Sequence, residues 1–236
     1  MKHRLRHHLL VRKQGDVTGD GREDLVMLVG TLPQDGGGFI TDITLVVEDG
    51  ASGQVTCVPL GDNAGFNPSI YLCDFTGEGV KDIKVTIQSG GSGGFTFTYV
   101  YSFVGNKPQL LFSHDMYMAS KEFRAYYAEN FVVVVEDLTL GLTFRIDVSQ
   151  NPAAQELYDE EGKLLQPTEA NVGPFIIAYP IVLDEEKGTC SLQALTRVYG
   201  QFAADTLGYI QDYLSWDGTR FATIREELAI FGTENT

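Results

Sequence analysis

Short runs of apolar, β-branched and aromatic residues, each closed by a glycine-rich or Asp-Gly turn, follow one another along most of the chain. The run 25–29 is followed by a glycine-rich connection, the run 39–47, a turn and the run 54–60. The same order of parts returns between residues 83 and 113. Runs of this length between turn residues are typical of β-strands. A third copy is predicted over 192–228, where Asp217-Gly218 between two runs is a strong hairpin signal.

The spacing of these copies predicts four units. Gly188 aligns with Gly21 and Gly79 but lies about twice as far from Gly79 as Gly79 lies from Gly21, which leaves room for a diverged unit with a hairpin at 131–148. We therefore predict a basic N-terminal arm over 1–14 and a single all-β repeat domain over 15–236. Its units lie at approximately 15–70, 71–119, 120–175 and 176–236.

Sheets of three or four short strands cannot bury their apolar faces alone, so we expect them to stack as a repeat array of antiparallel hairpins. A β-propeller or propeller-like array is the first interpretation. A β-sandwich built from the same hairpins is the alternative.

Two polar loops, at 16–24 and 74–82, place oxygen atoms at regular positions. Each offers side-chain oxygens at positions 1, 3, 5 and 9, a backbone carbonyl at position 7, and a glycine at position 6 that permits a sharp turn. Hard cations such as Ca²⁺ take six to eight oxygen ligands, and a tightly wound loop can supply them. The candidate ligands are Asp16, Thr18, Asp20, Arg22 and Asp24 in the first loop, and Asp74, Thr76, Glu78, Val80 and Asp82 in the second.

The residues after these loops separate two kinds of calcium site. An EF-hand loop has Glu at position 12 and a helix behind it, but Met27 and Val85 stand there, inside β-rich runs. The spacing instead resembles the calcium loops of FG-GAP or VCBS-type repeats, the blades of integrin-alpha-like β-propellers, whose pattern is close to D-x-[ND]-x-D-G-x-x-D before a strand. Thr18, Thr76 and Glu78 depart from that pattern. The alternative is a pair of metal-free turns held by Asx-type hydrogen bonds.

The resemblance is specific in the two nine-residue loops and extends over the other residues only as a pattern of strands. The whole chain also resembles uncharacterised VCBS-repeat proteins of Gram-positive, spore-forming bacteria, particularly across 200–211. The resemblance of the loops implies Ca²⁺ as the bound ion, whereas the resemblance of the whole chain carries no assigned activity.

The charge balance narrows the choice of partners. The 236 residues carry a formal net charge of −15, so we expect no nucleic acid and no anionic membrane surface as partner. The basic start of the chain is followed only by the apolar stretch 9–11, too short for a signal peptide, and we expect no membrane insertion. Calcium loops of this type function where Ca²⁺ is plentiful. We therefore expect an extracytoplasmic location and a natural N-terminus longer than this sequence.

Catalytic patterns are weak. His114, the only histidine after the first 14 residues, stands in Ser113-His114-Asp115, and consecutive residues cannot converge as a triad. Adjacent acids such as Glu226 and Glu227 usually point apart, unlike the carboxyl pair of a glycosidase. The alternating aromatics of 95–103 share one face of a strand, where core packing is the expected role and a sugar platform is the alternative.

The three cysteines show no C-x-x-C spacing, so neither a zinc site nor a disulfide framework is implied. Cys57 and Cys73 would pair if their strands were neighbours. We otherwise expect buried free thiols.

The sequence therefore predicts a non-enzymatic, calcium-binding β-repeat module for ligand or partner binding, or for scaffolding, at the bacterial cell surface. The expected partner is a protein or a glycan, and the oligomeric state is left open. A carbohydrate-active enzyme, or its accessory domain, is one alternative. A metal-free β-protein is the other.

Overall fold

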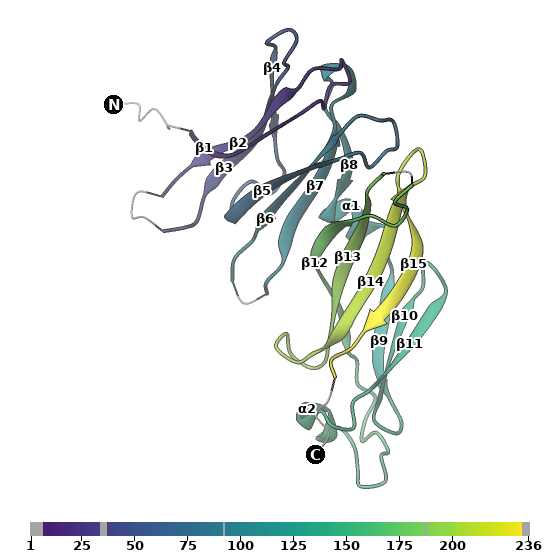
Figure 1. Cartoon of the computed structure of the whole chain (residues 1–236). Coiled ribbons are helices and arrows are strands. Elements are labelled where there is room, and N and C mark those ends of the chain that lie inside the picture. The colour runs from purple at the N-terminus through teal and green to yellow at the C-terminus, as the bar shows by residue number, and fades with distance from the viewer. Residues whose placement is uncertain (1–6, 34–36, 92, 187, 233–236) are drawn as a thin grey trace. The chain divides into compact units, whose positions relative to one another are not determined.

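The computed structural model describes residues 7–33, 37–91, 93–186 and 188–232. Within these residues the protein is all-β, with fifteen strands in four antiparallel sheets, two short α-helices and one 3₁₀ turn. The predicted all-β class with antiparallel sheets is therefore confirmed. Figure 1 shows the sheets coloured along the chain.

The first two sheets share one topology, in which each strand pairs with the next along the chain. Their orders are β1-β2-β3-β4 and β5-β6-β7-β8. The first contains β1 (His8–Gly15), β2 (Asp24–Thr31), β3 (Thr41–Glu48) and β4 (Val55–Pro59). The second contains β5 (Phe66–Cys73), β6 (Asp82–Gln88), β7 (Thr96–Ser102) and β8 (Gln109–Ser113), with the 3₁₀ turn Val104–Asn106 between its last two strands.

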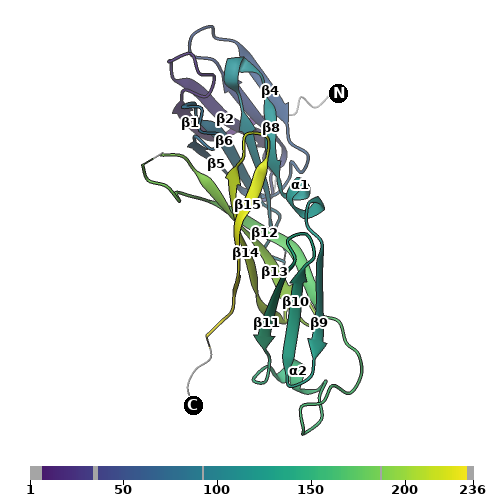
Figure 2. The same ribbon diagram turned by 90° about the vertical axis from the view of Figure 1, so that its right-hand side faces the viewer.

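The third sheet is smaller and has the order β11-β10-β9. It contains β9 (Phe123–Ala128), β10 (Val132–Asp137) and β11 (Leu142–Asp147), after helix α1 (His114–Ala119) and before helix α2 (Pro152–Gln155). Figure 2 shows its three strands side by side. Strands β10 and β11 confirm the hairpin that the sequence predicts for the diverged unit.

The fourth sheet returns to four strands in chain order, β12-β13-β14-β15. Its strands are β12 (Asn171–Ile181), β13 (Ser191–Tyr199), β14 (Thr206–Trp216) and β15 (Phe221–Ala229).

The chain forms two compact units, each with its own core. Unit 1 comprises the described residues within 1–114, 179–192 and 214–222, and unit 2 comprises those within 115–178, 193–213 and 223–236. In unit 1, Val26 and Leu28 of β2 share a buried cluster with Ile83 and Val85 of β6. Alternate residues of β2 are buried, as expected of a strand with one face against a core.

The alternating aromatics of 95–103 lie in the core of unit 1 for the most part. Tyr99, Tyr101 and Phe103 belong to its buried cluster, and Phe97 packs against it. The core interpretation of this row is confirmed for these four rings. In unit 2, Val133 and Val135 of β10 form the core with residues of β13 and β14, such as Val198 and Ile210.

The strand that opens each four-stranded sheet was missed by the sequence pattern. Strand β1 covers residues that we assigned to a basic arm, yet it pairs with β2 from His8↔Gly30 to Gly15↔Asp24, and residues 1–6 lie outside the described part. Strands β1, β5 and β12 are all edge strands. Edge strands tolerate charge and proline, here for example Pro68 and Pro174, so they lack a continuous apolar run.

The expected cysteine chemistry is wrong. Cys73 at the end of β5 forms a disulfide with Cys190, with a Cα–Cα distance of 6.1 Å and a sequence separation of 117. Cys57 is free and exposed on β4, which is not a neighbour of β5 in a sheet. The pairing escaped prediction because the two partners approach only in the folded chain.

Within the described residues, no helix has both the length and the apolar character needed to cross a membrane.

Candidate functional site

The two oxygen-rich loops occupy the same place in the fold. The first joins β1 to β2 and the second joins β5 to β6, so each connects the first and second strands of a four-stranded sheet. The segment aligned with them through Gly188 joins β12 to β13 in the fourth sheet. The loop alignment read from the sequence therefore coincides with a structural repeat.

In the first loop, the carboxylate at position 9 anchors the backbone. Asp24 is fully buried, and its Oδ2 accepts hydrogen bonds from the backbone N–H groups of Val17 at 2.8 Å and Thr18 at 2.9 Å. Its Oδ1 accepts a third, from the N–H of Gly50, at 2.9 Å. A buried carboxylate is tolerated when N–H donors compensate its lost hydration, as they do here.

The carboxylate at position 1 stabilises the turn by accepting hydrogen bonds from its backbone. Asp16 Oδ1 accepts from the Gly19 N–H at 2.7 Å, and Asp16 Oδ2 accepts from the Gly21 N–H at 2.9 Å. The φ angles of these two glycines are 80° and 85°, in the left-handed region that side chains with a Cβ rarely adopt. The glycines thus let successive N–H groups converge on one carboxylate.

The second loop repeats four of these hydrogen bonds, two at position 9 and two at position 1. Asp82 Oδ2 accepts from the N–H groups of Phe75 at 2.9 Å and Thr76 at 3.1 Å, while Asp74 accepts from Gly77 at 2.6 Å and Gly79 at 2.8 Å. Burial raises the pKa of Asp82 to about 6, against the lowering effect of the two N–H donors; the nearby charge of Asp74 also raises it.

The position 9 carboxylate is thus an anchor of the loop backbone. In the described chain, the carboxylate oxygens of Asp16, Asp20 and Asp24 do not all lie within 4.8 Å of one another. Asp20 at position 5 is exposed, and among the described residues only its Oδ1 has a hydrogen-bond partner, the N–H of Arg22 at 2.8 Å. Carboxylate oxygens keep a second lone pair after accepting one hydrogen bond. The chemistry of the donor set, all oxygen at positions 1, 3, 5 and 7, therefore suits a hard cation such as Ca²⁺.

Successive loops are joined by one repeated hydrogen bond. The N–H of Lys81, at position 8 of the second loop, donates to the carbonyl of Asp16, at position 1 of the first, at 3.2 Å. In the segment aligned through Gly188, which we call the third loop, Gly188 is at position 6 and Cys190 is at position 8. The N–H of Cys190 donates to the carbonyl of Asp74, at position 1 of the second loop, at 2.8 Å.

Packing between successive loops also joins equivalent positions. A Cβ built on Gly19 would lie 3.0 Å from Val80 Cγ2, and one built on Gly77 would lie 3.7 Å from Thr189 Cγ2, so position 4 meets position 7 of the next loop in both cases. The residue before position 1 meets position 8, as a packing contact between Gly15 and Lys81 in the first pair. In the second pair the same two positions hold the Cys73–Cys190 disulfide.

Unit 2 contains a buried charged cluster that no local sequence pattern indicates. The ammonium of Lys121 contacts three carboxylates, those of Asp137 at 3.1 Å, Glu226 at 2.9 Å and Asp212. The exposed fraction of the Lys121 side chain is 4%, and that of each acid is zero. The hydroxyl of Thr223 is a further acceptor, at 3.3 Å.

The protonation of this cluster is shifted because three acids share one ammonium. Burial raises the pKa of Glu226 to about 7, although Lys121 acts in the opposite direction. Burial also raises the pKa of Asp212, whereas Asp137, despite its burial, has a lowered pKa because the Leu140 N–H and Lys121 stabilise its charge. The four residues come from separate elements, so no local motif marks them. Glu226 and Glu227 do point apart, as expected of neighbours on a strand, with Glu227 half exposed.

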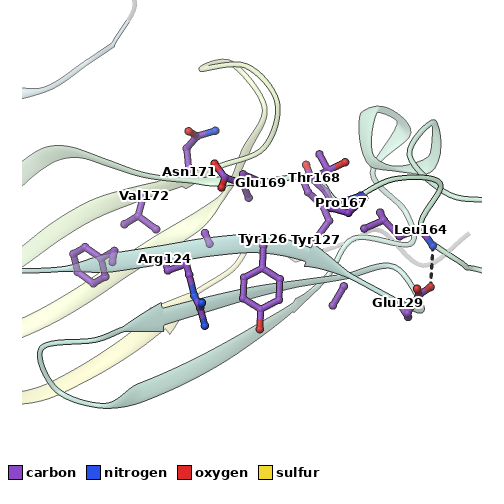
Figure 3. A pocket seen from close by; sticks show the side chains of 14 residues that line it. Arg124, Tyr126, Tyr127, Glu129, Leu164, Pro167, Thr168, Glu169, Asn171 and Val172 are labelled. Atoms are coloured by element: carbon purple, nitrogen blue, oxygen red, sulfur yellow. Dashed lines mark hydrogen bonds between the residues drawn. The ribbon is translucent and has the colours of Figure 1, made fainter.

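An open groove of about 1160 Å³ in unit 2 is lined by β9 and the segment 164–172, which is hydrogen-bonded to β9 through the Tyr127 N–H and the Thr168 carbonyl at 2.9 Å. Figure 3 shows Arg124 and Tyr126 projecting from one side of β9, and Asn171 projecting in the other direction from the neighbouring segment. The Arg124 guanidinium lies 5.4 Å from the Tyr126 ring centroid and pairs with Glu136. The Glu129 carboxylate accepts from the Leu164 N–H at 2.8 Å (Figure 3). The groove combines an aromatic ring, charges and an amide.

Comparison with known proteins places these features among relatives without an assigned activity. The family of YybI C-terminal domains matches residues 121–229, which contain the third and fourth sheets and the charged cluster. The chain is 34% identical over 229 residues to the uncharacterized protein YybI of Bacillus subtilis (strain 168), covering 96% of this chain and 86% of that protein. No solved structure matches the chain significantly.

Proposed function

The chain belongs to the YybI family, and we propose that it is a non-enzymatic, calcium-binding β-repeat protein that binds a ligand or partner, or acts as a scaffold, at the bacterial cell surface. One observation carries the proposal. The same oxygen-rich loop recurs at the same place in two sheets, with four matching N–H donors on the carboxylates at positions 1 and 9. Each loop contacts the loop of the next four-stranded sheet through matched positions. In this proposal Ca²⁺ binds through positions 1, 3, 5 and 7 and has a structural role.

The finer fold assignment belongs to the same proposal. We infer a propeller-like array related to FG-GAP and VCBS-type repeats, in which the first, second and fourth sheets are successive repeats. The matched contacts between their loops favour this stacking, because a repeat array reuses one interface between neighbours. The third sheet then lies within a segment inserted between the second and third repeats. A β-sandwich is the alternative architecture, suited to the way β10 packs with β13 and β14.

An extracytoplasmic location is supported by the Cys73–Cys190 disulfide, because such bonds persist in oxidising compartments and are rare in the cytosol. The groove beside β9 is the surface that we propose for a protein or glycan ligand, since it presents the ring of Tyr126 among polar groups. The carboxylates of the Lys121 cluster have no exposed surface for a substrate to reach, which favours a binding role over that of a carbohydrate-active enzyme.

Isothermal titration calorimetry tests the proposal. We expect metal-stripped protein to bind two Ca²⁺ ions during a titration to about 10 mM, above the about 10⁻⁴–10⁻³ M dissociation constants of extracellular calcium modules. Asp20→Asn and Glu78→Gln should each remove one site. Asp20→Asn keeps an oxygen acceptor for the Arg22 N–H, so the loop itself persists.

The matched control is Glu160→Gln, which removes an exposed acid outside the loops and should leave both sites intact. Absence of binding heat throughout the titration would favour a metal-free β-protein and overturn the proposal.

A further inference from the structure

The Cys73–Cys190 disulfide lies next to Asp74, the first proposed ligand of the second loop. Cys73 immediately precedes Asp74, and its partner Cys190 donates its own N–H to the Asp74 carbonyl at 2.8 Å. Asp74 is therefore fixed from both sides, by a covalent bond through its neighbour and by a hydrogen bond to its carbonyl. The same Asp74 carboxylate accepts the N–H groups of Gly77 and Gly79, so its position sets the path of the turn.

The first loop provides an internal comparison. Its first ligand, Asp16, accepts the equivalent hydrogen bond from Lys81 at the longer distance of 3.2 Å. The residue before it is Gly15, which packs against the Lys81 side chain without any covalent bond. The two loops share four backbone hydrogen bonds to the carboxylates at positions 1 and 9, and a disulfide joins the second loop, but not the first, to the loop that follows it.

We propose that the Cys73–Cys190 disulfide positions Asp74 for metal binding, so that a thiol reductant weakens Ca²⁺ binding at the second loop and leaves the first loop unchanged. This inference rests on the calcium binding proposed above. It assigns Cys190 a positioning role for a loop that lies more than 100 residues earlier in the chain.

The redox step needs a dithiol as reductant. One thiolate attacks a sulfur of the Cys73–Cys190 bond, forms a mixed disulfide and releases the other cysteine, and the second thiol of the reductant then resolves it. The protein gains two electrons and two protons and carries two thiols, while the dithiol becomes a disulfide. Cys73 is half-buried and Cys190 is buried, so attack at Cys73 is the more accessible route.

After reduction, position 8 of the third loop is held to the second by the Cys190 hydrogen bond and by packing such as that of Thr189 on Gly77. If the freed segment loses that one hydrogen bond, the second loop binds Ca²⁺ about fivefold more weakly, which corresponds to about 1 kcal/mol.

The test measures each loop separately. Asp20→Asn disables the first loop and reports Ca²⁺ affinity at the second, while Glu78→Gln does the reverse. Both proteins are titrated with Ca²⁺ by calorimetry, oxidised and after treatment with dithiothreitol. We expect about fivefold weaker binding in reduced Asp20→Asn and no change in Glu78→Gln. In the Asp20→Asn background, the double replacement Cys73→Ser, Cys190→Ser should give the Ca²⁺ affinity of the reduced protein, and dithiothreitol should not change that affinity.

Amide hydrogen exchange in chelator supplies a readout that does not depend on metal. Reduction should speed exchange at Gly77, Gly79 and Cys190 and leave Gly19 and Gly21 unchanged. Calcium binding that is equally strong at the second loop before and after reduction, or equal weakening at both loops, overturns the inference while leaving the proposed function standing. Absence of Ca²⁺ binding under both conditions overturns the proposed function and this inference with it.

Discussion

Replacement of Lys121 by Met removes the ammonium from the charged cluster of unit 2. The Met side chain has a similar length and is uncharged, so it fills the space of Lys121 beside Tyr117 and Phe123, whose ring centroids lie 5.8 and 5.9 Å from Nζ. What is lost is the positive charge that contacts three carboxylates with no exposed surface.

The expected loss is large because the acids stay buried. Breaking a buried ion pair by removing one partner typically costs about 3–5 kcal/mol. Here the ammonium serves three acids, and Asp212 Oδ1 and Glu226 Oε1 already have no hydrogen-bond partner in the described chain. We expect the free energy of unfolding to fall by about 4 kcal/mol at pH 8.

The loss should shrink at acidic pH. Removal of the ammonium raises the already raised pKa values of Asp212 and Glu226 further and removes one cause of the lowered pKa of Asp137. Stability tied to a raised pKa is complete below the unfolded pKa and is lost as pH rises through the folded pKa. The deficit of Lys121→Met should therefore be small at pH 5 and full at pH 8.

Urea unfolding followed by circular dichroism at both pH values measures these effects. The control is Lys107→Met, at an exposed lysine, which should change stability by no more than about 0.5 kcal/mol. A loss below about 1 kcal/mol at pH 8, or a deficit independent of pH, would refute the assignment of a buried, undercompensated cluster.

Three further results are expected. In chelator, Asp24→Ala should lower the free energy of unfolding by about 3 kcal/mol, because three backbone N–H groups lose their acceptor. Asp20→Ala should lower it by no more than about 0.5 kcal/mol, and equal losses in urea unfolding would contradict the anchor role of Asp24. Replacing Cys73 and Cys190 by Ser should lower the free energy of unfolding by about 4–5 kcal/mol, the chain-entropy value for a closed loop of about 100 residues, and an unchanged urea midpoint would oppose this. Because the pKa of Glu226 is raised from 4.5 to about 7, its titration should make stability fall as pH rises across that window; Glu226→Gln should flatten the profile measured by urea unfolding, and an unaltered profile would count against this titration.

The repeat was predictable from the sequence because its signal is local. The alternation of apolar runs with glycine turns predicts the inner strands of each sheet, and the spacing of Asp and Gly residues predicts the loops at the same topological position. The edge strands were less predictable. Strand β1 carries Arg12 and Lys13, and β12 carries two prolines, because an edge strand needs no continuous apolar run.

The features that required the structure depend on distant residues. Asp24 and Asp16 look equivalent as ligands in the sequence, but only the fold shows that Asp24 is buried and holds three backbone N–H groups. The disulfide and the Lys121 cluster join residues that are far apart in the chain, so no spacing rule marks them.

The calcium assignment is tested most directly by the melting temperature of metal-stripped protein titrated with Ca²⁺, compared with the double variant Asp20→Asn, Glu78→Gln. Ligands that bind only the folded state stabilise it by about 2.7 kcal/mol per site at a concentration 100 times the dissociation constant. With two sites, the melting temperature of the unmodified protein should rise by about 10 °C or more, and that of the double variant should rise far less. A melting temperature that does not change with Ca²⁺ in either protein would contradict the assignment and identify both loops as metal-free turns.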